Sequence, residues 1–274
     1  MIKPHPKPPN IKRLPVSKRM TIAVGMFCNS GVVFGADTEE QIGDMTRRVH
    51  KIPTLYPPYP RAMITGSCLN GHLMDTAVER IFDGLKQGGA KDEGSIMDLL
   101  DRTMVGLYRR EFKAYPDQGS IAMRLLVAVK PDHESKVYAW SIDSSVVRRM
   151  TSPHEIVGVG ELVQYIADHL NQGTESLANV IVEMVQVLSA AKDRVLGVGG
   201  DSYVHWICDD GSMGQKNFSF SPDTEELYEY FLTHGRSLLI ATGTEEITDE
   251  QLDKLGEEFV ADLKWKRARM FGKR

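Results

Sequence analysis

The order of its apolar segments constrains the fold of this chain more than any other feature of the sequence. Short segments rich in β-branched and apolar residues come in groups, and pairs of segments with apolar residues at helical spacing lie between the groups. Because strands do not alternate singly with helices, a doubly wound parallel sheet is disfavoured. The pattern predicts an α+β fold: a four-layer αββα sandwich of two antiparallel sheets between helical layers.

The individual elements are expected from the same pattern and from turn sequences. Asn29-Ser30-Gly31 is typical of a tight hairpin between the first two strands. Residues 39–48 are polar and are expected to form a loop or a short twisted hairpin, and Ser95 is expected to cap the second helix. We predict strands at 21–28, 32–36, 62–66, 121–129, 136–142, 156–159 and 203–208. We predict helices at 73–85, 95–108, 161–170, 175–194, 224–239 and 249–270.

The two ends of the chain differ from its middle. Residues 1–19 contain five prolines and six basic residues, and no acidic residue. Such a segment cannot form a helix interior or a central strand, so we expect an extended leader outside the fold. Residues 20–217 carry the strand and helix pattern and are predicted to form one domain. Residues 218–274 are predicted to form a C-terminal helical extension.

Charge and composition disfavour several classes of partner. The chain has 274 residues and a net charge of −4, and neither basic end carries interleaved aromatic residues or a nucleic-acid-binding motif. No apolar run approaches the roughly 18 residues of a membrane span. The basic N-terminus has no apolar signal-peptide core, so the cytoplasm is the expected location. Three widely spaced cysteines favour reduced thiols over a disulfide framework.

Metal and phosphate sites are not expected from the sequence. Its acidic and histidine residues nowhere show the spacing of metal ligands. The glycine-rich stretch at 197–200 lacks the lysine of a phosphate-binding loop. We therefore expect no metal and no cofactor. Four histidines are expected to be ordinary surface or core residues: His50, His72, His154 and His205.

Three residues around the first hairpin suggest nucleophilic catalysis. Thr21 opens the first strand, Asp37 ends the second, and Lys51 follows. A threonine hydroxyl needs a base, and the α-amine of an N-terminal threonine, with a reference pKa of about 7.7–8, can serve as one. A lysine stabilises developing negative charge, and a carboxylate holds the lysine. The N–H of Gly66, at the end of another strand, is a candidate oxyanion donor.

The same residue types also have an ordinary interpretation. An aspartate at the end of a strand is most often a turn residue, and a lysine after it is most often a solvated surface charge. Residue types alone therefore leave the catalytic hypothesis open.

A resemblance to a known family favours catalysis. The segments TIAVG (21–25), GVVFGAD (31–37), HKI (50–52) and AMITG (62–66) resemble, in order and spacing, the proteasome subunit family of N-terminal-nucleophile hydrolases, and its β-subunits in particular. The likeness extends over roughly 20–211. Further similar segments are the hairpin 125–143, the GVG element at 158–160, and the helix and glycine turn at 189–200.

The resemblance implies a role for each matching position. Thr21 falls on the nucleophile, Asp37 on the carboxylate that orients the lysine, Lys51 on the catalytic lysine and Gly66 on the oxyanion hole. Ile64 and Cys68 fall on positions that line the substrate pocket. The implied activity is cleavage of peptide bonds through an acyl-enzyme on Thr21, without a metal or cofactor. The implied assembly is a ring-forming homo-oligomer that acts on peptides or unfolded polypeptides.

Several positions depart from the family pattern. Val159 replaces a serine of the GSG element, and Val195 and Val198 replace an aspartate and a serine near the glycine turn. Met20 and the leader precede Thr21, whose nitrogen is then an amide and not a base. Translation from Met20, followed by removal of the initiator methionine, would expose Thr21. Two alternatives therefore remain: a catalytically silent structural subunit, and an amidohydrolase of the same superfamily that acts on a small molecule.

Overall fold

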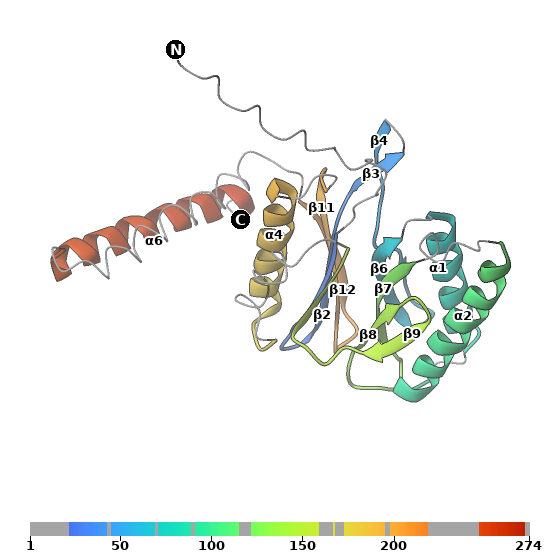
Figure 1. The fold of residues 1–274 in the computed structure, drawn as a ribbon. Helices are drawn as coiled ribbons and strands as arrows, with labels where there is room; N and C mark the ends of the chain where they lie inside the picture. The colour runs from blue at the N-terminus through green and yellow to red at the C-terminus, as the bar shows by residue number, and fades with distance from the viewer. Residues whose placement is uncertain are drawn as a thin grey trace, which may run out of the picture.

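The computed structural model describes residues 22–42, 45–68, 71–88, 91–114, 122–158, 167, 173–194, 198–218 and 247–271. Two five-stranded antiparallel sheets lie face to face, with helices on both outer sides (Figure 1). The predicted four-layer αββα fold is therefore confirmed. The leader at 1–19 and the predicted helix at 224–239 lie outside the described residues, as does the predicted helix at 161–170 apart from Ala167, which is helical.

The first sheet has the strand order β10-β1-β2-β11-β12. Its centre is the predicted hairpin, in which Cys28 pairs with Gly31 across the turn. Strand β2 also pairs with β11, so that Asp37 lies opposite Ser202. The strands are β1 (Ala23–Cys28), β2 (Gly31–Asp37), β10 (His154–Val157), β11 (Ser202–Cys208) and β12 (Met213–Phe218).

The second sheet has the strand order β5-β6-β7-β8-β9. The polar segment 39–48 forms a separate two-stranded hairpin of β3 (Glu39–Ile42) and β4 (Met45–Arg48), one of its two expected forms. The strands of the second sheet are β5 (Thr54–Leu55), β6 (Arg61–Cys68), β7 (Met123–Lys130), β8 (Tyr138–Asp143) and β9 (Val146–Arg149).

Both sheets are buried on two faces, which explains their nearly continuous apolar strands. In β2, Phe34 packs between the two sheets while Val33 faces helix α4 (Leu177–Arg194). In β6, Met63 packs between the sheets while Ile64 faces the helices on the other side. Side chains therefore alternate between an inner layer and an outer layer on either side.

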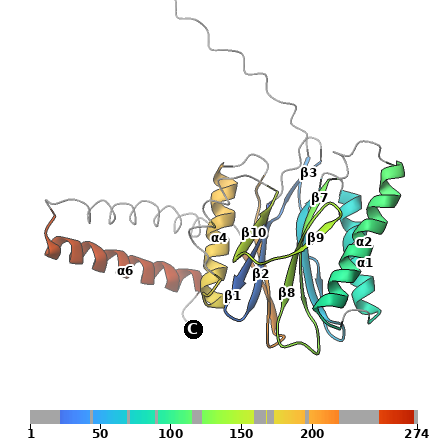
Figure 2. The ribbon, with the colours of Figure 1, turned by 60° about the horizontal axis from the view of Figure 1, so that its bottom comes forward.

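Helices α1 (Gly71–Lys86) and α2 (Glu93–Ala114) cover the second sheet, and α4 covers the first (Figure 2). The start of α2 corrects one prediction. Asp92, not Ser95, caps the helix: its Oδ1 accepts the Ser95 N–H at 2.8 Å, and Ser95 Oγ accepts the Asp92 N–H at 3.1 Å. This reciprocal pair is a capping box, so Ser95 lies at the third helical position.

Helix α6 (Asp249–Phe271) confirms the helix predicted at 249–270 and extends away from the α4 side of the sandwich (Figures 1 and 2). The division of the chain at residue 218 remains a prediction. None of the helices in the described part of the chain is both long and apolar enough to cross a bilayer.

Candidate functional site

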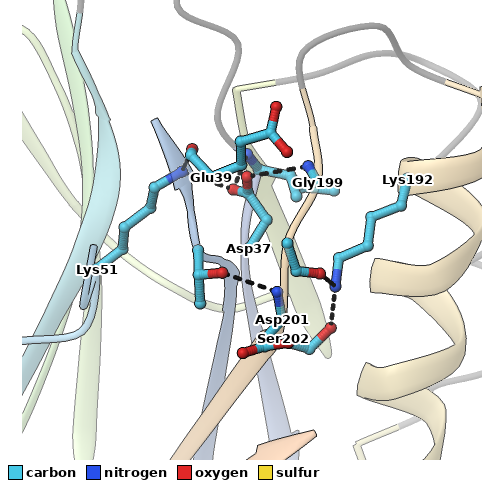
Figure 3. Close-up of polar contacts among 10 residues, drawn as sticks. Asp37, Glu39, Lys51, Lys192, Gly199, Asp201 and Ser202 are labelled. Atoms are coloured by element: carbon cyan, nitrogen blue, oxygen red, sulfur yellow. Dashed lines mark hydrogen bonds and ion pairs between the residues drawn. The ribbon is translucent and has the colours of Figure 1, made fainter. Parts of the chain in front are cut away.

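The structure brings Asp37 and Lys51 together. Asp37 ends β2 with its side chain fully buried, and Lys51 Nζ lies 3.0 Å from its Oδ1 with only 10% of the lysine side chain exposed (Figure 3). Lys51 also donates to the backbone carbonyl of Glu39. The lysine is therefore held at two points and is not the solvated surface charge of the alternative interpretation.

The Asp37 carboxylate also accepts hydrogen bonds from two backbone N–H groups. The Ile22 N–H donates to Oδ1 at 3.1 Å, and the Gly199 N–H donates to Oδ2 at 3.4 Å. Burial raises the pKa of the Asp37 carboxyl, and the Lys51 ammonium and these N–H groups only partly offset that rise. Segments far apart in the sequence thus meet at one buried carboxylate.

Thr21 lies outside the described residues, but its covalent neighbour does not. Ile22 is fully buried, and its N–H is one of the groups bonded to Asp37. The backbone nitrogen of Ile22 is therefore held at the same carboxylate oxygen that Lys51 contacts.

Gly66 lies in β6 on the edge nearest the Lys51 segment. The Ile64 N–H points away from β7 and donates to the Pro53 carbonyl at 3.0 Å. Because N–H directions repeat every second residue in a strand, the Gly66 N–H faces the same edge. Strand β5 pairs with β6 only at Thr54 and Leu55, opposite Met63 and Ala62. The role of Gly66 as an oxyanion donor remains a prediction.

A packing constraint also requires glycine at position 66. A Cβ there would meet the Arg124 carbonyl oxygen and lie 2.8 Å from Leu125 Cδ2. We expect Gly66→Ala to destabilise the fold by about 1–3 kcal/mol. In urea unfolding, Gly106→Ala in α2 is the control, because its Cβ meets nothing within 4 Å and alanine favours a helix by about 0.5–1 kcal/mol. Equal stability of the two variants would contradict the packing requirement.

The two predicted pocket residues lie on the outer face of β6. Ile64 is fully buried in the apolar cluster that also contains residues of α1 and α2, and the half-buried Cys68 packs against the same cluster. Their role in a substrate pocket remains a prediction.

Residues that the sequence did not single out hold the glycine turn against the end of β2. The Thr38 N–H donates to the Asp201 carbonyl at 3.0 Å, and the Asp201 N–H donates to Thr38 Oγ1 at 2.8 Å. Lys192 of α4 donates to the Gly200 carbonyl at 2.8 Å and to Ser202 Oγ at 2.7 Å. Figure 3 shows Lys51 and Lys192 approaching from opposite sides. No motif signals these contacts, because they depend on how β2 and β11 pair.

The departures from the family pattern are only partly described by the structure. Val198 is buried in the apolar cluster beneath α4. Val159 and Val195 lie outside the described residues. The N–H of Gly199, next to Val198, instead supplies a polar contact to Asp37.

The chain matches no protein-family model and no curated protein. Solved structures do match. They include a Gly-1 mutant of Anbu from Hyphomicrobium sp. strain MC1. The TM-score is 0.70 at 16% identity, over 82% of this chain and 100% of that one. The fold of this chain is therefore similar to that of Anbu. The Yersinia bercovieri Anbu, described as an ancestral β-subunit, gives a TM-score of 0.68 at 15% identity over 81% of this chain and 96% of that one.

The helical assembly of the Anbu complex from Pseudomonas aeruginosa gives a TM-score of 0.68 at 13% identity, over 80% of this chain and 95% of that one. These matches correct the predicted kinship with proteasome β-subunits, because the similar structures are Anbu proteins, a distinct proteasome-like family. At these identities the likeness concerns the fold. The short motifs behind the first assignment describe a hairpin and its neighbouring strands, which related folds share.

Proposed function

We propose that the chain is an N-terminal-nucleophile amide hydrolase whose nucleophile is Thr21 once that residue is the first of the chain. One observation carries the proposal: the buried Asp37–Lys51 pair is bonded to the N–H of Ile22, the residue after Thr21. The proposal sets the hydroxyl and the α-amine of Thr21 beside this ammonium and carboxylate. A threonine nucleophile needs an adjacent base, and its own α-amine can be that base.

The chemistry proceeds in two steps. The Thr21 α-amine takes the proton of its own hydroxyl as the oxygen attacks the amide carbon, and it then gives that proton to the leaving nitrogen. This forms an ester on Thr21 and releases an amine. Water, deprotonated by the same amine, cleaves the ester and restores the hydroxyl. Lys51 stabilises the developing negative charge, Asp37 fixes Lys51, and the Gly66 N–H is the oxyanion donor.

We propose peptides as substrates and a homo-oligomer as the working form. A peptide offers the amide bond that this chemistry cleaves. Support for self-association comes from the similar Pseudomonas aeruginosa protein, which is described as a helical assembly of the Anbu complex. Ring formation by this chain remains a prediction.

A covalent probe tests the nucleophile. The chain is produced as residues 21–274 from a cleavable fusion, and a peptide epoxyketone is added, because its two electrophilic carbons consume an adjacent hydroxyl and amine. We expect one adduct per chain by intact mass, located on the N-terminal peptide, and none in Thr21→Ala. Absence of an adduct on folded protein that begins at Thr21 would overturn the proposal.

One observation favours a second candidate, a catalytically silent structural subunit. Val198 packs in the apolar cluster beneath α4, at a position where the family pattern has a serine near the threonine amine. The same experiment separates the two candidates. A folded assembly that begins at Thr21 and gives no adduct would favour scaffolding.

A further inference from the structure

Two histidines from distant parts of the chain meet beside Lys51. His50 precedes Lys51, and His205 lies in β11, 155 residues further along. Their Nε2 atoms are 3.1 Å apart. His205 is buried, with 2% of its surface exposed, whereas His50 is exposed. One imidazole is thus fixed in the core and faces a second that solvent can reach.

The hydrogen bonds of Thr54 fix the tautomer of His205. The Thr54 hydroxyl donates to the Ile52 carbonyl at 3.0 Å and lies 3.0 Å from Nδ1 of His205. A hydroxyl has one hydrogen, so toward His205 it accepts, and Nδ1 carries the hydrogen. Nε2 of the neutral His205 ring is then an acceptor at hydrogen-bond distance from Nε2 of His50, and a bound cation would take the place of the hydrogen between them.

We propose that His50 and His205 bind a transition-metal cation such as Zn²⁺ or Cu²⁺ through their Nε2 atoms. Two nitrogens that are each about 2.0–2.1 Å from one ion lie about 2.9 Å apart at a right angle and about 3.3 Å apart at the tetrahedral angle. The observed 3.1 Å falls between these values. The Nδ1–H bond to Thr54 is the second contact that orients a metal-binding histidine and raises its basicity.

The proposed metal site leaves coordination positions open, unlike a structural zinc site, in which protein side chains fill all of them. Among the described residues, no group of three or more His, Cys, Asp or Glu side chains is placed to hold an ion. Water or an exogenous ligand would complete the coordination, as in metal sites that keep an open position. The Tyr203 ring packs edge-on against His50, with 4.9 Å between the centroids, and limits the directions that the His50 ring can take.

The sequence could not reveal this site. Both histidines were expected to be ordinary surface or core residues, because no metal-ligand spacing joins them. Their meeting depends on the pairing of β11 with β2 and on the path of the segment before β5. The inference concerns binding alone, and it does not depend on the proposed hydrolase activity.

Zinc titration of the full chain tests the proposal. Tag-free protein is treated with a chelator, dialysed, and titrated with Zn²⁺ by isothermal titration calorimetry. We expect one saturable site per chain that is lost in His50→Gln, a change at an exposed residue that keeps the fold. His72→Gln, which alters an exposed histidine of α1, is the matched control and should titrate as wild type. Thr54→Val should weaken binding by about 10–100-fold while keeping both ligands.

A second measurement counts the ligands. In the electron paramagnetic resonance spectrum of the Cu²⁺-loaded protein, we expect superhyperfine splitting from two imidazole nitrogens in the wild type and from fewer in His50→Gln. Absence of a saturable site in the wild type would overturn the proposal. A His50→Gln variant that titrates as wild type, or equal loss of binding in His72→Gln, would do the same. Far-UV circular dichroism of each variant verifies that the fold is retained.

Discussion

Replacing Lys51 with methionine is expected to lower the free energy of unfolding by about 3–5 kcal/mol. Asp37 is fully buried, and Lys51 is its charged partner at 3.0 Å. Removing the ammonium leaves a carboxylate in the core with only backbone N–H groups to stabilise it. Urea unfolding followed by circular dichroism measures the effect. Lys86→Met is the matched control: its pair with Asp83 is exposed, and we expect a loss below about 1 kcal/mol.

The same variant has a predictable pH dependence. Without Lys51, burial is less opposed, so the pKa of Asp37 in the folded state rises further above the unfolded value of about 3.9. The folded state then holds the proton more tightly. The loss of stability that this carboxyl causes is smallest at and below its unfolded pKa. The loss grows as pH rises toward the folded-state pKa and is constant above it. Relative to wild type, Lys51→Met should be least impaired near pH 4 and most impaired at pH 7 and above.

A double variant isolates the charge. Asp37→Asn combined with Lys51→Met removes both ions and leaves an amide oxygen that can still accept the Ile22 N–H. We expect it to be more stable at pH 7 than Lys51→Met alone, with no pH-dependent difference from this position. A Lys51→Met variant as stable as wild type at pH 7 would mean that the pair does not carry its charge in the core.

Blocking the α-amine of Thr21 is expected to lower amide hydrolysis by about 10²–10⁴-fold, the usual contribution of a general base. The comparison is between protein that begins at Thr21 and the full chain with Met1 retained, verified by intact mass. With the leader attached, the Thr21 nitrogen is an amide and cannot accept the hydroxyl proton. Initial rates on a fluorogenic peptide measure the difference.

Two variants separate the base from the nucleophile. In the chain that begins at Thr21, Ala at this position should abolish turnover, because no hydroxyl remains. Ser should retain measurable turnover, because it keeps both the hydroxyl and the amine. Equal rates from the full chain and from the chain that begins at Thr21 would rule out the amine as the base. Unfolding curves recorded in parallel ensure that lost activity is not lost structure.

The hairpin of β1 and β2 could be predicted from the sequence because its signals are local. Asn29-Ser30-Gly31 specifies the turn, and a nearly continuous apolar run indicates a strand buried on both faces. The pairing of Lys51 with Asp37 was predicted from the chemistry of these residue types and from the family resemblance, and not from a local signal. The strands at the edges of the sheets gave no such local signal. Strand β12, with the sequence MGQKNF, is polar because it lies at the edge of its sheet.

Contacts between distant segments could not be predicted in this way. The N–H of Gly199 reaches Asp37 only because β11 pairs with β2, and the glycine turn itself carries no sign of that partner. The N-cap of α2 was predicted at the wrong residue for a different reason. Asp92 and Ser95 are both good capping residues, and only the geometry of the helix start decides between them. The family assignment failed because short strand motifs are shared by related folds.

The contacts of Asp37 also determine when, during synthesis, the candidate site can form. Its contacts come from Ile22, Lys51 and Gly199, and the last of these lies at position 199 of 274. A nascent chain that has left the ribosome only as far as Lys51 holds the carboxylate and the lysine without the glycine turn whose N–H completes the contacts of Asp37. Maturation of the site is thereby coupled to completion of the sandwich, and a truncated product ending before this turn would lack a finished centre.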